Sequence, residues 1–117
     1  MGHPVPSLDR LVADAKVSGR PYLEFVRTPS MSVGVYVLPV GGLDLQSPHQ
    51  EEEVYHVVRG RAKFRDGGGE RPVRPGDVLV VPAQTAHRFE AIEEELVLLV
   101  VFAPPESGTT EPTTLPG

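Results

Sequence analysis

The chain changes its hydrophobic period near residue 21. Before that point, apolar residues recur at the helical spacing i, i+3, i+4, i+7, at Leu8, Leu11, Val12 and Ala15. Ser7 precedes this run as a candidate N-cap, and Gly19 follows it as a candidate end. The pattern predicts one short helix, which needs a packing partner to be stable because isolated short helices are marginal in water.

From residue 21 onward, apolar and polar residues alternate with period two, which is typical of strands. The clearest apolar or alternating segments are 31–38, 54–58, 62–65, 78–81, 96–102 and a stretch around His87 and Phe89. Turn sequences rich in Gly, Pro and Asp separate them, about every 8–12 residues, so we expect about eight or nine strands in an all-β sandwich or barrel. No polar residue interrupts 96–102, so we predict that this strand is buried on both faces.

A length of 117 residues suits one domain. We divide the chain into an N-terminal segment with the helix (1–20), a barrel (21–103) and a tail (104–117). The tail is predicted to be disordered because it offers few apolar residues to bury.

The composition excludes several classes of function. A formal net charge of −5 argues against nucleic-acid binding, which needs a basic face. The absence of cysteine excludes disulfides and thiolate chemistry. No signal peptide is visible, and the longest apolar run, Leu96 to Ala103, is far shorter than the roughly 20 residues of a membrane-spanning helix. We therefore expect a cytoplasmic protein with no membrane partner.

Three residues form a candidate metal site. His49 and Glu53 are four residues apart in one extended segment, so their side chains share a face. His87 can join them from another strand. Two imidazoles and a carboxylate suit one divalent transition metal (Fe, Mn, Zn, Ni or Cu) and leave coordination positions open for a substrate. In the alternative interpretation, His49 lies in a turn, His87 is a core residue and Glu53 belongs to a solvated run, 51–53.

The glycines and prolines around these residues form two recognisable motifs. The first is Gly41-x5-Ser47-x-His49-x3-Glu53-x6-Gly60, and the second is Gly76-x5-Pro82-x-Gln84-x2-His87-x3-Ala91. They resemble the two cupin motifs, G-x5-H-x-H-x3–4-E-x6-G and G-x5-P-x-G-x2-H-x3-N. The resemblance implies a double-stranded β-helix (a jelly-roll or cupin barrel) that holds a metal between His49, Glu53 and His87.

The chain departs from the cupin pattern at three positions. Ser47 replaces a ligand histidine, so the usual four protein ligands become three; Gln84 replaces a turn glycine and Ala91 an asparagine. Because Pro48 follows Ser47, the backbone there is expected to be extended, so Gln46 or Ser47 can face the site as an outer contact. Glu51 shares the face of Glu53 and is an alternative ligand, although the spacing to Gly60 favours Glu53.

The other inward positions describe the ligand. By parity, Tyr55 and Val57 share the face of Glu53, and Phe89 and Ala91 share that of His87. Basic residues fall on the opposite parity or beyond a turn: Arg61, Lys63, Arg65 and Arg88. We therefore predict a small, uncharged or aromatic substrate, contacted by the Tyr55 phenol.

His56 falls on the outer face with Val54 and Val58, and we predict that the helix or a second subunit covers this apolar face. The resemblance implies a homodimer. The leading functional interpretation is an oxygenase-like, dioxygenase-type oxidoreductase. The alternatives are a non-catalytic small-molecule-binding or sensor cupin, a metal-dependent isomerase or lyase, and a barrel that serves mainly for dimerisation.

Overall fold

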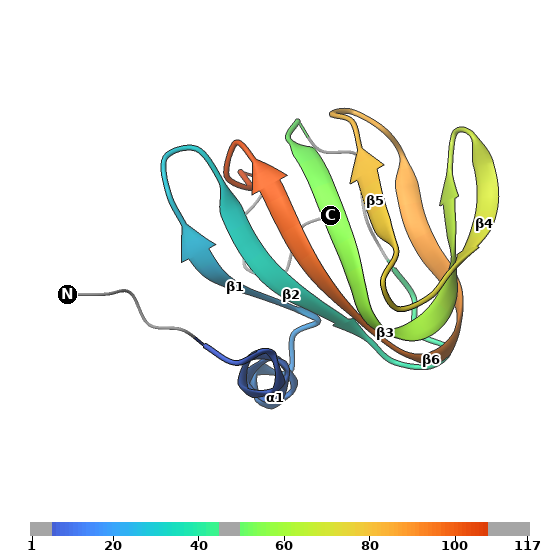
Figure 1. Cartoon of the computed structure of the whole chain (residues 1–117), viewed down its shortest axis with the longest axis horizontal. Coiled ribbons are helices and arrows are strands. Elements are labelled where there is room, and N and C mark those ends of the chain that lie inside the picture. The colour runs from blue at the N-terminus through green and yellow to red at the C-terminus, as the bar shows by residue number, and fades with distance from the viewer. Residues whose placement is uncertain (1–5, 45–49, 108–117) are drawn as a thin grey trace.

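The computed structural model describes residues 6–44 and 50–107 (Figure 1). In chain order its elements are α1 (Leu8–Ser18), β1 (Tyr22–Arg27), β2 (Ser32–Leu38), β3 (Glu52–Asp66), β4 (Gly69–Val73), β5 (Val78–Val81) and β6 (His87–Ala103). The predicted all-β class and the single short helix are confirmed.

The strands form one curled antiparallel sheet with the order β1-β2-β6-β3-β4, and β5 pairs with the first part of β3 on the edge opposite to β6. The two longest strands, β3 and β6, pair along nearly their whole length and bend together, so the sheet folds over on itself into a barrel (Figure 1). This is the double-stranded β-helix that the motifs imply.

The described residues hold fewer and longer strands than the turn signals predict. β3 continues through Gly60, where a break was expected, and the pairing of β3 with β6 shifts register on both sides of it. Gly60 has φ 98°, and a Cβ there would overlap the carbonyl oxygen of Glu95. The glycine therefore marks a bulge that bends a continuous strand, and it is required both by its backbone angle and by the close approach of β6.

A second irregularity corrects one prediction. Ala91 was expected on the cavity side with Phe89, but it is exposed, and the next residue, Ile92, is buried instead. The reason is that Ala91 has φ 51°, which interrupts the alternation of β6. Gln84, at the other departure from the second motif, also has a positive φ, 62°. Glycine and asparagine tolerate this left-handed region best, which explains the residues that the motif favours there.

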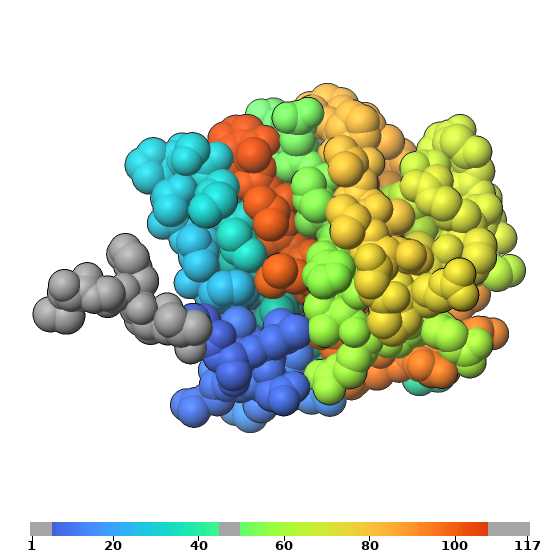
Figure 2. All heavy atoms as spheres, viewed as in Figure 1, coloured from blue at the N-terminus to red at the C-terminus, as the bar shows by residue number. Residues whose placement is uncertain are grey.

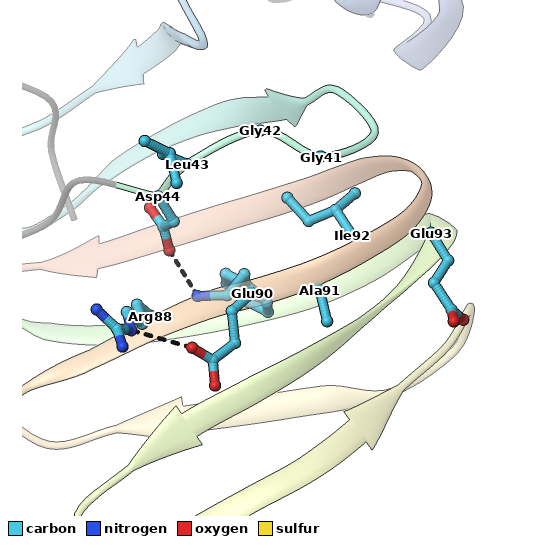
Figure 3. Close-up of a pocket in the computed structure, with 10 residues that line it drawn as sticks. Gly41, Gly42, Leu43, Asp44, Arg88, Glu90, Ala91, Ile92 and Glu93 are labelled. Carbon is cyan, nitrogen blue, oxygen red and sulfur yellow. Dashed lines mark hydrogen bonds and ion pairs between the residues drawn. The ribbon is translucent and has the colours of Figure 1, made fainter.

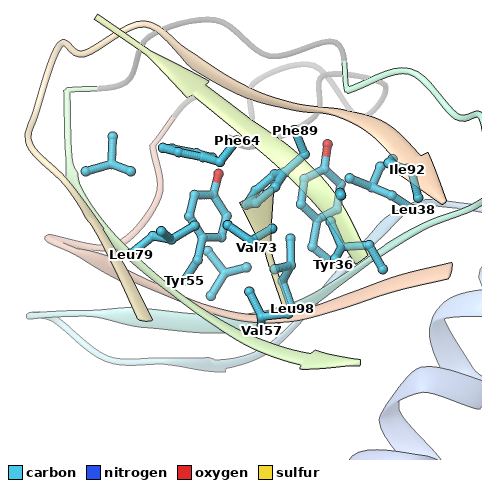
Figure 4. Packing of buried hydrophobic residues seen from close by; sticks show 14 of the residues in the cluster. Tyr36, Leu38, Tyr55, Val57, Phe64, Val73, Leu79, Phe89, Ile92 and Leu98 are labelled. Carbon is cyan, nitrogen blue, oxygen red and sulfur yellow. The ribbon is translucent and has the colours of Figure 1, made fainter. Parts of the chain in front are cut away.

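Two apolar clusters lie on opposite faces of the sheet. The larger one fills the barrel and includes Tyr36, Tyr55, Phe64, Phe89 and Leu98 (Figure 4). The smaller one lies between α1 and the outer face, where Leu11, Val12 and Ala15 pack against Val35, Val37 and Val97. Thus β2 and the second half of β6 are covered on both sides, as predicted for 96–102; only Leu99 and Val101 there are half-buried.

Helix α1 has the predicted ends. The Ser7 hydroxyl accepts a hydrogen bond from the Arg10 amide (3.2 Å), and Gly19 closes the helix with φ 74°. The helix covers only part of the outer face (Figure 2). Val58 packs in the helix cluster, whereas His56 is exposed and the neighbouring Val78 and Val80 of β5 are 61% and 67% exposed. An apolar strip along β5 therefore has no cover from α1.

Candidate metal and ligand site

Strand β3 places Glu53 in the interior, between Val81 of β5 and Phe102 of β6. Glu53 is 1% exposed, so it is not part of a solvated run. Tyr55 and Val57, two and four residues further along, are fully buried in the same cluster. The predicted inward parity of this strand is confirmed, and Glu51 is also buried.

Strand β6 begins at His87, whose side chain meets Glu53 inside the barrel. The Nε2 atom of His87 lies 3.1 Å from Oε1 of Glu53 and 3.1 Å from the Tyr55 hydroxyl. Its other ring nitrogen, Nδ1, lies 2.8 Å from the carbonyl oxygen of Thr85. Since a carbonyl oxygen only accepts, Nδ1 carries a proton and donates it to this bond. In the neutral ring, Nε2 then presents a lone pair towards Glu53 and Tyr55.

The pKa of His87 reflects opposing influences. Burial disfavours the charged ring and lowers its pKa, but the adjacent Glu53 carboxylate and the Thr85 carbonyl together outweigh burial and raise it above 6.5. Burial and the Glu53 carboxylate also raise the pKa of Tyr55. The phenol therefore remains a proton donor at neutral pH.

The Glu53 carboxylate is the least satisfied buried group in this region. Neither of its oxygens makes a hydrogen bond of acceptable geometry with the described residues, although Oε1 faces the His87 nitrogen. A buried carboxylate without a well-aligned hydrogen bond is costly, and a bound cation is one way to compensate it. A carboxylate and an imidazole Nε2 that converge, with the second ring nitrogen fixed by a carbonyl, have the donor chemistry of a transition-metal site.

The third predicted ligand, His49, lies outside the described residues, as do Gln46 and Ser47. Within the ranges 6–44 and 50–107, no three potential metal-binding side chains converge. Whether His49 joins Glu53 and His87 therefore stays a prediction.

Sequence reasoning missed Asp44, which is buried directly before that segment. One of its carboxylate oxygens accepts a hydrogen bond from the Tyr36 hydroxyl (2.5 Å) and the other from the Phe89 amide (2.7 Å). Phe89 is two residues from His87, so Asp44 is bonded to the strand that carries a site residue. Asp44 and Phe89 also line a hollow of about 500 Å³ between residues 41–44 and β6 (Figure 3).

The segment after β6 was predicted to be a disordered tail (104–117), but its first residues, 104–107, are described by the structure and packed against the barrel. Glu106 is 1% exposed. Its amide donates to the Ser32 hydroxyl (2.9 Å), and its carbonyl oxygen accepts from the Arg27 guanidinium (2.8 Å). The next residue, Ser107, donates its hydroxyl hydrogen to Glu51. Residues 106–107 thus connect β2 to the start of β3 across the interior face of β6.

Tyr22 is another interior residue without a motif signal. Its ring lies over Gly34, where a Cβ would collide with the phenol, and it contacts Phe102 edge-on at 6.2 Å between ring centroids. Its buried hydroxyl makes no hydrogen bond with any described residue. Burial raises the pKa of Tyr22, and Glu24, Glu106 and Glu53 raise it further, so the hydroxyl remains a donor close to interior carboxylates.

Basic residues lie outside, as the parity predicts. Arg61, Lys63, Arg65 and Arg88 are exposed and pair with surface glutamates. In the part of the chain that the structure describes, the buried polar residues are Ser32, Asp44, Glu51, Glu53, His87 and Glu106. Among residues 6–44 and 50–107, the buried ionisable side chains are therefore four acids and one histidine.

Comparison with known proteins supports the interpretation of the two sequence motifs. The family model described as "Cupin domain" matches residues 34–102, which include most of β2, all of β3, β4 and β5, and nearly all of β6. This chain belongs to the cupin family. An uncharacterized protein of Streptomyces coelicolor is 48% identical to this cupin over 100 residues, covering 86% of this chain and 95% of the relative.

Solved structures share the fold at low identity. An uncharacterized conserved protein with a double-stranded β-helix domain from Klebsiella pneumoniae aligns with a TM-score of 0.72 and 20% identity, covering 92% of this chain and 95% of the other. The DMSP lyase DddQ from Ruegeria pomeroyi aligns with a TM-score of 0.65 and 20% identity, covering 80% of this chain and 50% of the lyase. Proteins of such different descriptions share the barrel, so the barrel alone does not assign a reaction.

Among residues 6–44 and 50–107 the structure has one helix, α1. This helix is neither long enough nor apolar enough to span a membrane.

Proposed function

We propose that this cupin binds one divalent transition metal through His49, Glu53 and His87 and uses it in an oxygenase-like oxidoreductase reaction on a small, uncharged or aromatic substrate. The observation that carries the metal proposal is the buried Glu53 carboxylate. It has no hydrogen bond among the described residues and faces Nε2 of a histidine whose Nδ1 is held by Thr85. The metal identity (Fe, Mn, Zn, Ni or Cu) is left open by this donor set.

A bound metal supplies a Lewis acid with open coordination positions. The chain's own residues supply the surroundings. The Thr85 carbonyl fixes the orientation of the His87 ring, and the Tyr55 hydroxyl, 3.1 Å from the same ring, is the proposed substrate contact. Phe89 and Phe64 pack against Tyr55, with the Tyr55 and Phe89 centroids 4.9 Å apart, so the surroundings of the phenol are aromatic. These aromatic surroundings support the choice of an uncharged or aromatic substrate.

Elemental analysis tests the metal proposal directly. Protein purified without a polyhistidine tag should contain about one equivalent of a transition metal, and the variants Glu53→Ala and His87→Ala should lose most of it. Glu52→Ala and His56→Ala are matched controls because both residues are exposed neighbours on β3. Equal metal content in the wild type and both site variants contradicts the proposal.

The reaction class needs a separate measurement. Oxygen uptake by the iron- or manganese-loaded protein with small phenols and enols supports an oxygenase. Turnover without oxygen favours the alternative of a metal-dependent isomerase or lyase, a reaction class that the name of the Ruegeria pomeroyi structure illustrates in this fold. Tight binding without turnover favours a sensor or binding protein.

We also propose that the chain forms a homodimer through the apolar strip along β5. Val78 and Val80 are mostly exposed there, beside His56 and the half-buried Val54. Burying them against a second copy removes apolar surface from water. Sedimentation should show a dimer that Val80→Glu weakens, whereas a monomeric wild type contradicts this proposal.

A further inference from the structure

The outer face of the sheet carries a band of valines that helix α1 does not cover. The strand registers align Val33 of β2 with Val101 of β6, Val101 with Val54 of β3, and Val54 with Val80 of β5. Residues paired in this way point to the same side of a sheet. Val78 and Val80 are mostly exposed, the other three are half-buried, and none of the five packs in the helix cluster. These five residues form the valine band.

His56 lies inside this apolar surface. Along β3 its outward neighbours are Val54 and Val58, and across the sheet it pairs with Leu99 of β6 and Val78 of β5. All four neighbours are apolar. The imidazole is exposed and forms no hydrogen bond or ion pair within residues 6–44 and 50–107. A titratable ring therefore stands without a polar partner on a face that is otherwise built from aliphatic side chains.

The charged side chains on the elements around His56 share one property, which is that none of them forms an ion pair with it. They are Glu52 and Arg59 on β3 before the Gly60 bulge, Arg74 and Asp77 in the turn before β5, Glu95 on β6, and Asp9, Arg10, Asp14 and Lys16 on α1. Several pair with each other, as Arg59 does with Asp9 (3.9 Å) and Glu95 with Lys16 (3.0 Å). A protonated His56 thus has no acid on its own subunit to compensate its charge.

A second copy of the chain fits the valine band. The chain has a net charge of −5, so charged surfaces of two identical copies repel each other in most orientations. The band contains no charged residue, and a two-fold dimer brings the same patch of each copy together. Two sheets can pack face to face through such side chains. Because His56 adjoins both Val54 and Val78, a partner that covers these two valines also covers the imidazole.

We propose that the homodimer is pH-sensitive and dissociates on acidification, because His56 enters its interface uncharged. This inference rests on the proposed homodimer through β5 and names its regulation. Imidazoles gain their positive charge between about pH 8 and pH 5. Moving a cation from water into an apolar contact without a partner is costly, so a protonated copy associates poorly. Each dimer contains two copies of His56, and association therefore releases protons from both.

Sedimentation of the full-length chain in a dilution series measures the dissociation constant of the dimer at pH 7.5 and at pH 5.5. The wild-type constant should rise by at least about tenfold at the lower pH, since two imidazoles per dimer must lose their protons. His56→Gln, which is polar but uncharged at both pH values, and His56→Leu should each change by less than about twofold. Both variants retain His87 and the rest of the interior, so any effect of those groups on the dimer is common to all three proteins.

The outcomes separate this inference from the dimer on which it rests. A wild-type dimer with the same dissociation constant at both pH values overturns the inference and leaves the homodimer standing. A His56→Gln variant that responds to pH as the wild type does also overturns it. Far-ultraviolet circular dichroism is recorded at both pH values, and dissociation that coincides with loss of the β-sheet signal overturns the inference because unfolding then explains it. A wild type that is monomeric at both pH values overturns the homodimer and this inference together.

Discussion

Replacing Glu53 with glutamine should raise the stability of the metal-free protein while removing its response to metal. In the wild type, the 1%-exposed carboxylate makes no hydrogen bond among the described residues, and its Oε1 lies 3.1 Å from Nε2 of His87. Because Nδ1 of His87 donates to Thr85, the neutral ring offers Nε2 only as an acceptor, which repels the carboxylate. The glutamine amide keeps the shape and can donate a hydrogen bond to that nitrogen.

The expected magnitudes follow from burial. Leaving a polar group buried and unpaired costs about 1–3 kcal/mol, so Glu53→Gln should stabilise the apoprotein by about this amount. At about 4 °C per kcal/mol for a domain near 100 residues, the melting temperature rises by about 4–12 °C. Metal at 100 times its Kd adds about 2.7 kcal/mol to a protein that binds it only when folded. This gain, about 11 °C on the same scale, should appear in the wild type and be largely absent from the variant.

Thermal unfolding at pH 8, followed by circular dichroism with EDTA and then with excess zinc or manganese, measures both effects. The exposed neighbour Glu52 provides the control, since Glu52→Gln should change the melting temperature little under either condition. A Glu53→Gln variant that is less stable than the wild type in EDTA refutes the argument that the carboxylate is buried at a cost. A metal-induced rise of equal size in both proteins refutes its role as a ligand.

Three further predictions concern pH and backbone strain. In the apoprotein the pKa of His87 is raised above 6.5, so the stability that its protonated ring contributes is fully present below pH 6.5 and is lost as the pH rises through the higher folded pKa. Urea unfolding from pH 5.5 to 9 should therefore show the wild type losing stability relative to His87→Gln. A stability difference that stays constant over this range contradicts the prediction. Gly60→Ala should lower the free energy of unfolding by at least about 3 kcal/mol, whereas Gly19→Ala, with a similar positive φ but open space around it, should lower it by only about 1–2 kcal/mol. Equal losses in urea titrations would show that the close approach of β6 to Gly60 does not matter. Gln84→Gly and Ala91→Asn, which restore the family residues at φ 62° and 51°, should each raise the free energy of unfolding by about 0.5–1 kcal/mol, and a loss of stability in both shows that these turns carry no strain.

Much of the fold and part of the site were predictable from the chain. The helical spacing from Leu8 to Ala15 and the caps at Ser7 and Gly19 set α1, because these are local backbone and packing preferences. Period-two alternation placed Glu53, Tyr55 and Val57 on the inner face, since side chains alternate regularly along an unbroken strand. The two motifs identified the cupin barrel, and their glycines correspond to real positive-φ positions such as Gly60.

Other features depended on contacts between distant segments. Parity failed at Ala91 because a positive φ there interrupts the alternation, and the pairing of β6 with β3 shifts register in the same region. Asp44 and Glu106 showed no signal, because each becomes an interior group only through bonds to residues 45 and 74 positions away. The sequence by itself determined the helix, the all-β class, the inward face of β3 and the family. Only the tertiary structure decided which acids share the interior, because burial of a charge depends on what the rest of the chain encloses.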